Sequence, residues 1–130
     1  MTQHLSMISL VIDDYDRAID HYVNTFGFEL VEDTELEPSG KRWVVVRPAG
    51  STAAKILLAK AKNDREKAAI GNQSGGRVWL FLDTDDFWPD YERYLAQGVE
   101  IARAPSEESY GMVCVLKDGY GNLWDLVQRH

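Results

Sequence analysis

The chain has 130 residues, of which 45% are hydrophobic and 27% charged, the size and composition of a single soluble globular domain. A net charge of −7 argues against nucleic acid as a partner, and one cysteine excludes a disulfide framework or a cysteine-rich metal cluster. No apolar stretch approaches the roughly 20 residues that cross a bilayer, and no export signal opens the chain. We therefore expect a cytoplasmic protein without membrane partners.

The first half of the sequence predicts four strands and one helix in the order β-α-β-β-β. Asp13 and Asp14 precede the helix as N-cap candidates, because a short carboxylate can accept from the free N–H groups of a first turn. Gly27 is expected to end the helix in a left-handed conformation. The apolar face of the helix comprises Ala18, Ile19, Tyr22, Val23 and Phe26. The strands are expected at 5–12, 28–36, 41–47 and 54–59.

The second half repeats this order after a polar connector at about 60–76, which has helical composition near 64–70. Asp85 and Asp86 are the N-cap candidates of its helix, and Gly98 ends that helix. The strand at 77–84 is apolar in its centre, which predicts that both of its faces are covered. The remaining strands are expected at 99–103, 110–117 and 122–127.

The two halves match at an offset of 72 residues where the helices begin and 71 residues at Gly27 and Gly98, where they end. Asp13-Asp14-Tyr15 and Asp85-Asp86-Phe87 open corresponding helices 72 positions apart. A repeat of this length indicates two copies of one supersecondary unit rather than a solenoid. We assign one domain over 1–130, with β-α-β-β-β modules at about 5–59 and 77–128.

These features resemble the vicinal oxygen chelate superfamily, which includes glyoxalase I, bleomycin-resistance proteins and extradiol dioxygenases. The likeness is carried by residues 14–22, by Phe26-Gly27-Phe28-Glu29-Leu30 and by the closing run 118–127, which follows the family pattern D-x-x-G-N-x-x-E-L with Asp125 in place of Glu. The resemblance implies an α+β fold in which paired modules form an eight-stranded, incompletely closed barrel. It also implies a homodimer.

Catalytic members of the superfamily hold a divalent metal, and their ligand positions fall on Met7, Trp79 and Asp125 of this chain. Only Asp125 suits a hard cation, because Met7 offers a soft thioether and the indole nitrogen of Trp79 has no lone pair to give. We therefore expect no metal cofactor. As an alternative, Asp83 and Asp125 could hold a weakly bound divalent ion through waters.

The resemblance also indicates which residues line the barrel. Alternation along the strands places one set on the inner face, and two further aromatic residues are added to it: Met7, Ser9, Trp79, Phe81, Asp83, Leu123 and Asp125, with Trp43 and Tyr110. These side chains either fill a small core or form an aromatic ligand pocket with acidic groups at its base.

Two functions follow from that pocket. The first is a metal-free binding protein similar to the bleomycin-resistance branch, which would take a small organic molecule, aromatic or cationic, because a carboxylate beside a ring suits such a ligand. The second is a glyoxalase-like lyase or isomerase with a degenerate metal site. In that enzyme Asp125 or Asp83 would act as general base and Tyr110 as proton donor.

Overall fold

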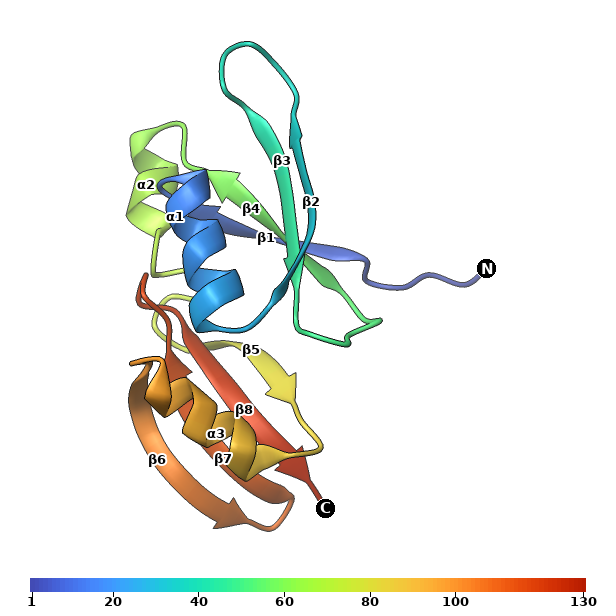
Figure 1. Ribbon diagram of the computed structural model, residues 1–130, viewed down its shortest axis with the longest axis vertical. Helices are drawn as coiled ribbons and strands as arrows, with labels where there is room; N and C mark the ends of the chain where they lie inside the picture. The colour runs from blue at the N-terminus through green and yellow to red at the C-terminus, as the bar shows by residue number, and fades with distance from the viewer. The chain divides into compact units, whose positions relative to one another are not determined.

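The computed structural model describes all residues from 1 to 130. The chain forms two compact units, Met1–Ile70 and Gly71–His130, each built on a four-stranded mixed sheet with helices (Figure 1). The predicted α+β class is confirmed. None of the helices combines the length and hydrophobicity needed to span a bilayer.

The first unit follows the predicted order, and its strand boundaries differ from the predicted ones by at most two residues. Its sheet has the strand order β1-β4-β3-β2, in which β1 runs parallel to β4 and the other pairs are antiparallel. The elements are β1 (Met7–Ile12), α1 (Tyr15–Ile19), η1 (Asp20–Thr25), β2 (Glu29–Glu35), β3 (Arg42–Arg47), β4 (Lys55–Lys60) and α2 (Asp64–Ala69).

The helical segment of the first unit begins as predicted and then widens. The Asp14 side chain accepts from the N–H of Arg17 at 2.8 Å, which confirms it as the N-cap. Beyond Ile19 the chain continues as a π-helix, in which the N–H of Phe26 donates to the carbonyl of His21 at 3.0 Å. Gly27 then takes a φ of 77°, the left-handed conformation expected of it.

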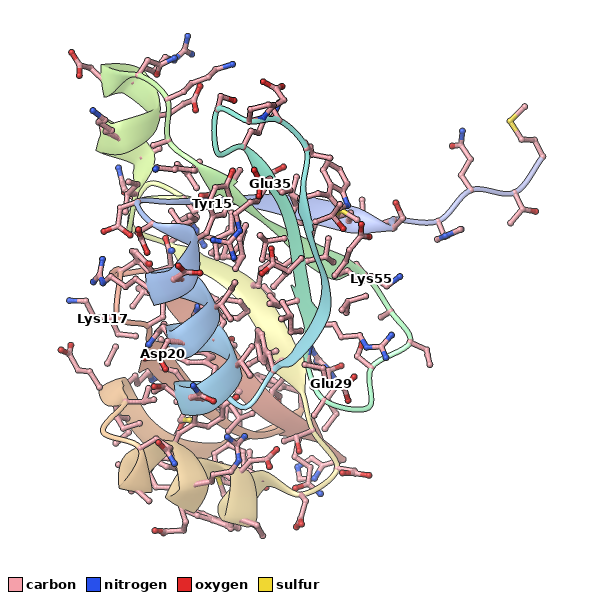
Figure 2. The ribbon with its side chains drawn as sticks, turned by 45° about the horizontal axis from the view of Figure 1, so that its top comes forward. Tyr15, Asp20, Glu29, Glu35, Lys55 and Lys117 are labelled. Carbon is pink, nitrogen blue, oxygen red and sulfur yellow. The ribbon has the colours of Figure 1, made fainter.

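One face of the first sheet packs against α1 (Figure 1). The Arg42 guanidinium identifies that face, because it pairs with Asp16 of α1 at 2.9 Å and with Asp33 of β2 at 2.7 Å. Tyr15 is labelled at the start of α1 in Figure 2, and the Cζ atom of the same guanidinium lies over its ring, 5.1 Å from the centroid of the ring. The apolar core of this face is fully buried and includes Leu10, Leu58, Val44, Val46, Ala18 and Tyr22.

The second unit has the strand order β5-β8-β7-β6, with β5 parallel to β8. Its elements are β5 (Val78–Asp83), α3 (Phe87–Ala96), β6 (Glu100–Glu108), β7 (Gly111–Lys117) and β8 (Leu123–Arg129). The prediction that the sixth strand ends at residue 103 was wrong. The strand continues to Glu108, which pairs with Gly111, so a tight turn at 109–110 joins β6 to β7. Two register shifts interrupt β6 and had hidden its alternation.

Two further expectations for this unit were wrong. Asp86 stands at the N-cap of α3 but its side chain makes no capping hydrogen bond. Instead, the Gln128 side chain from β8 accepts from the N–H of Phe87 at 2.8 Å. Nor are both faces of β5 covered, because Phe81 is 61% exposed and Asp83 is exposed.

Candidate functional site

The capping contact of Gln128 fixes which side of β8 faces α3. Gln128 reaches the first turn of α3, so the residues that share its parity, Trp124 and Leu126, lie on the helix-covered face and are buried. Leu123 and Asp125 therefore lie on the opposite face of the second sheet.

On that opposite face, four residues from four strands form one continuous row. Phe81 of β5 pairs with Asp125 of β8, Asp125 pairs with Val115 of β7, and Val115 pairs with Arg103 of β6. Paired residues on neighbouring strands point to the same side of a sheet. We call these four residues the Asp125 row.

The two ends of the Asp125 row are accessible and its middle is covered. The side chains of Phe81 and Arg103 are 61% and 62% exposed, whereas Val115 is only 8% exposed and Asp125 is half-buried. Burial raises the pKa of the Asp125 carboxyl, and the guanidinium groups of Arg103 and Arg129 oppose that rise. A partly desolvated carboxylate thus lies next to an exposed aromatic ring.

Arg103 was not among the predicted site residues. Its place in the row follows from the register shifts on either side of it, which sequence alternation does not reveal. Its guanidinium donates to Glu108 at 3.3 Å, and Ser106 donates to the same carboxylate oxygen at 3.0 Å. This exposed contact orients Arg103 only loosely.

The turn before β8 holds the row in register. One carboxylate oxygen of Asp118 accepts from the backbone N–H groups of Tyr120, Gly121 and Asn122 at 2.9–3.0 Å. The other accepts from the indole N–H of Trp124 at 2.9 Å. Since Asp118 is buried, these bonds fix the start of β8 and hence the position of Asp125.

The other predicted residues of this unit take different positions relative to the row. Asp83 is two positions from Phe81 on β5, and its carboxylate pairs with Arg129 at 3.4 Å. Trp79 lies at a register shift in β5, and its ring packs edge-on against buried Trp124 with centroids 5.4 Å apart. Leu123 pairs with Val78 and Lys117, and Tyr110 lies in the tight turn with a 47% exposed side chain.

Met7, Ser9 and Trp43 belong to the first unit. Trp43 neighbours Arg42 on β3, so it points away from α1, and its side chain is 37% exposed. Ser9 occupies the row of the first sheet that corresponds to the Asp125 row, in the order Ser9, Leu57, Val45 and Glu32. The predicted residues thus form two groups, one on each sheet.

The side chains at the family's metal-ligand positions do not suit a divalent ion. Met7 and Trp79 supply a thioether and an indole N–H, which leaves Asp125 as the one hard donor. No group of three or more His, Cys, Asp or Glu side chains comes together within either unit. Cys114 lies on β7, where it pairs with Leu126, the residue after Asp125 on β8. Its side chain is buried, and burial together with the Asp125 charge raises the pKa of its thiol to about 11.

Two β-α-β-β-β units, the second with a tight turn at Asp118–Asn122 before its last strand, define a duplicated-module α+β protein that carries the Asp125 row on its second sheet. The chain belongs to the Glyoxalase/Bleomycin resistance protein/Dioxygenase superfamily, whose sequence profile matches residues 4–126. The predicted superfamily is thereby confirmed.

Individual relatives agree with this assignment. An uncharacterized protein of Shewanella frigidimarina (strain NCIMB 400) is 53% identical over 128 residues, covering 98% of this chain and 95% of its own. The crystal structure of UcmS2 shares the fold with a TM-score of 0.84 at 23% identity, over 98% of both chains. TnmS3, an antibiotic binding protein from Streptomyces sp. CB03234, has a TM-score of 0.77 at 28% identity, over 99% of this chain and 98% of its own.

Proposed function

We propose that this protein binds a small organic molecule without a metal, and that the Asp125 row contributes the chemistry of recognition. The observation that carries the proposal is the pairing of Phe81 with Asp125, an exposed ring beside a half-buried carboxylate. The ring offers a flat apolar surface and the carboxylate a negative charge, which suits an aromatic or cationic ligand. The other predicted residues are also proposed as ligand contacts: Asp83, Trp79, Tyr110 and Leu123 on the second unit and, separately, Met7, Ser9 and Trp43 on the first.

Two observations support this proposal. Of the three family metal-ligand positions, only Asp125 offers a hard ligand, and metal-dependent chemistry needs more than one. TnmS3 is described as an antibiotic binding protein and is 28% identical to this chain. A planar antibiotic with a basic group therefore heads the ligand classes to be tested. In keeping with the family, we also propose a cytoplasmic homodimer, which sedimentation of the full chain would check.

The test is calorimetric titration of planar antibiotics and aromatic amines into the protein, together with elemental analysis of protein purified without chelators. We expect at least one of these compounds to bind. Phe81→Ala and Asp125→Asn should each lower its affinity about tenfold. Asp85→Asn, an exposed charge change outside the row, should leave the affinity unchanged. Stoichiometric metal, or a binder indifferent to both row variants, would overturn the proposal.

A second candidate function is a lyase or isomerase in which Asp125 removes a proton from the substrate, with Asp83 as an alternative base and Tyr110 as proton donor. The raised pKa of Asp125 favours it, because a general base works best when its pKa approaches the working pH. Turnover by the wild type should fall at least about a hundredfold in Asp125→Asn, with substrate affinity retained. Unchanged turnover would eliminate Asp125 as the base.

A further inference from the structure

We infer that Arg103 is part of the same ligand site and that it selects molecules carrying both an anionic and a cationic group. The inference rests on the proposed function, since it concerns the same row. It changes the expected ligand from a cation to an amphoteric compound, whose two polar groups lie on opposite sides of an apolar body.

The geometry of the row supports this. Arg103 and Asp125 lie on strands β6 and β8, separated by the single strand β7. Neighbouring strands are about 4.8 Å apart, so the two Cα atoms are separated by roughly 10 Å. Between them lies Val115, an apolar residue that offers neither charge a partner. A base and an acid thus flank an apolar floor.

The guanidinium of Arg103 is not consumed by structural contacts. Its ion pair with Glu108 is 3.3 Å long, with side chains 62% and 36% exposed, and such surface pairs contribute little stability. Arg42 provides the contrast: its guanidinium is 24% exposed and pairs with two carboxylates at 2.9 and 2.7 Å. Arg42 is a structural clamp, whereas Arg103 retains the planar set of donors with which arginine binds carboxylates and phosphates.

The charges within the chain are consistent with this role. Arg103 is close enough to Asp125 to act on its carboxyl electrostatically, yet its hydrogen bond goes to Glu108. A ligand with one anionic and one cationic end would meet both groups without breaking an internal ion pair between them. A purely cationic ligand would leave Arg103 facing a charge of its own sign.

Three probes built on one benzene ring test the inference: 4-(aminomethyl)benzoate, which carries both charges, 4-methylbenzylamine, which is only cationic, and 4-methylbenzoate, which is only anionic. Their affinities are measured by NMR titration of the full-length wild type, Arg103→Gln, Arg103→Lys and Arg77→Gln. Arg77 is an exposed arginine ahead of β5, so its variant changes net charge equally without touching the row.

We expect the doubly charged probe to bind the wild type about three- to tenfold more tightly than the amine. Arg103→Gln should remove that advantage, Arg103→Lys should retain part of it, and Arg77→Gln should leave it intact. Equal affinity of the doubly charged probe and the amine, or equal loss in both glutamine variants, overturns the role of Arg103 and leaves the proposed function standing. If none of the three probes binds, the proposed function fails with it.

Discussion

Asp118 and Trp124 are joined by a hydrogen bond of 2.9 Å between a buried carboxylate and a buried indole N–H. Because the other oxygen of Asp118 accepts three backbone N–H groups, one side chain closes the turn and anchors the first residues of β8. This bond therefore connects the stability of the second unit to the position of the Asp125 row.

Asp118→Ala should lower the free energy of unfolding by at least about 3 kcal/mol, because several buried donors lose their acceptor. Asp118→Asn should cost less, since its amide oxygen can still accept from the backbone. Urea denaturation measures both values. A double-mutant cycle with Trp124→Phe should show that Asp118→Asn costs less once the indole N–H is gone; additive costs would mean that the 2.9 Å bond contributes no coupling.

Gly71 and Gly75 offer a matched comparison, because both have a positive φ, 74° and 71°, but different surroundings. A Cβ on Gly71 would lie 1.8 Å from the carbonyl oxygen of Tyr120, whereas a Cβ on Gly75 would meet nothing within 4 Å. Gly75→Ala should therefore cost about 1 kcal/mol for the left-handed conformation. Gly71→Ala should cost roughly 2 kcal/mol more, because backbone must move.

Thermal unfolding monitored by circular dichroism provides the comparison of the two alanine variants. Similar melting temperatures for both would show that the segment at Gly71 can move away from Tyr120 at little cost.

The two helix caps give a third prediction. Gln128→Ala and Asp14→Ala should each cost about 1 kcal/mol, because each side chain accepts from the N–H of a first helical turn. Asp86→Ala should cost less than about 0.5 kcal/mol, since the Asp86 side chain makes no capping bond. Chemical denaturation of the three variants decides between Asp86 and Gln128 as the cap of α3; a large effect of Asp86→Ala would reinstate the expectation from sequence.

The local signals in the sequence were sufficient for most element ends. Asp14 and Gly27 lie within a few residues of the groups that they satisfy, so the sequence predicts them correctly. Gln128 caps Phe87 from 41 positions away, and no local pattern indicates such a contact. The sequence pattern also did not distinguish an α-helix from the π-helix of η1, because the same apolar residues face inward in both.

The sequence predicts the part of the Asp125 row on β5 and β8 but not the part on β6. Strand alternation predicts Phe81 and Asp125 on the same face, and the register of β5 and β8 pairs them. Arg103 was missed because the register shifts of β6 break alternation around it. Trp79 also lies at a shift, and its ring contacts Trp124, a relationship that a regular strand would not predict.

Asp125 gives a prediction of pH dependence. Burial raises the pKa of its carboxyl, so the folded state holds the proton more tightly than the unfolded state, in which an aspartate titrates near pKa 3.9. The contribution of Asp125 to stability is therefore fully present below about pH 3.9 and decreases as pH rises through the folded pKa. Asp125→Asn, which removes this titration, should be more stable than the wild type at pH 7.

Urea denaturation at pH 7 and pH 3 measures this difference, which should shrink at the lower pH. Asp85→Asn serves as the control, since Asp85 is exposed and should show no such trend. A wild type more stable than Asp125→Asn at pH 7 would mean that favourable contacts of the carboxylate outweigh its burial.

The corresponding rows of the two sheets have only one residue type in common, the valine at the third position. The rows are Ser9-Leu57-Val45-Glu32 and Phe81-Asp125-Val115-Arg103. Duplication thus supplied two equivalent scaffolds, and their chemistry diverged independently of the backbone pattern. The first sheet is consequently a natural acceptor for a transplanted row. Replacing Ser9, Leu57 and Glu32 by Phe, Asp and Arg would ask whether recognition can be copied within a single chain.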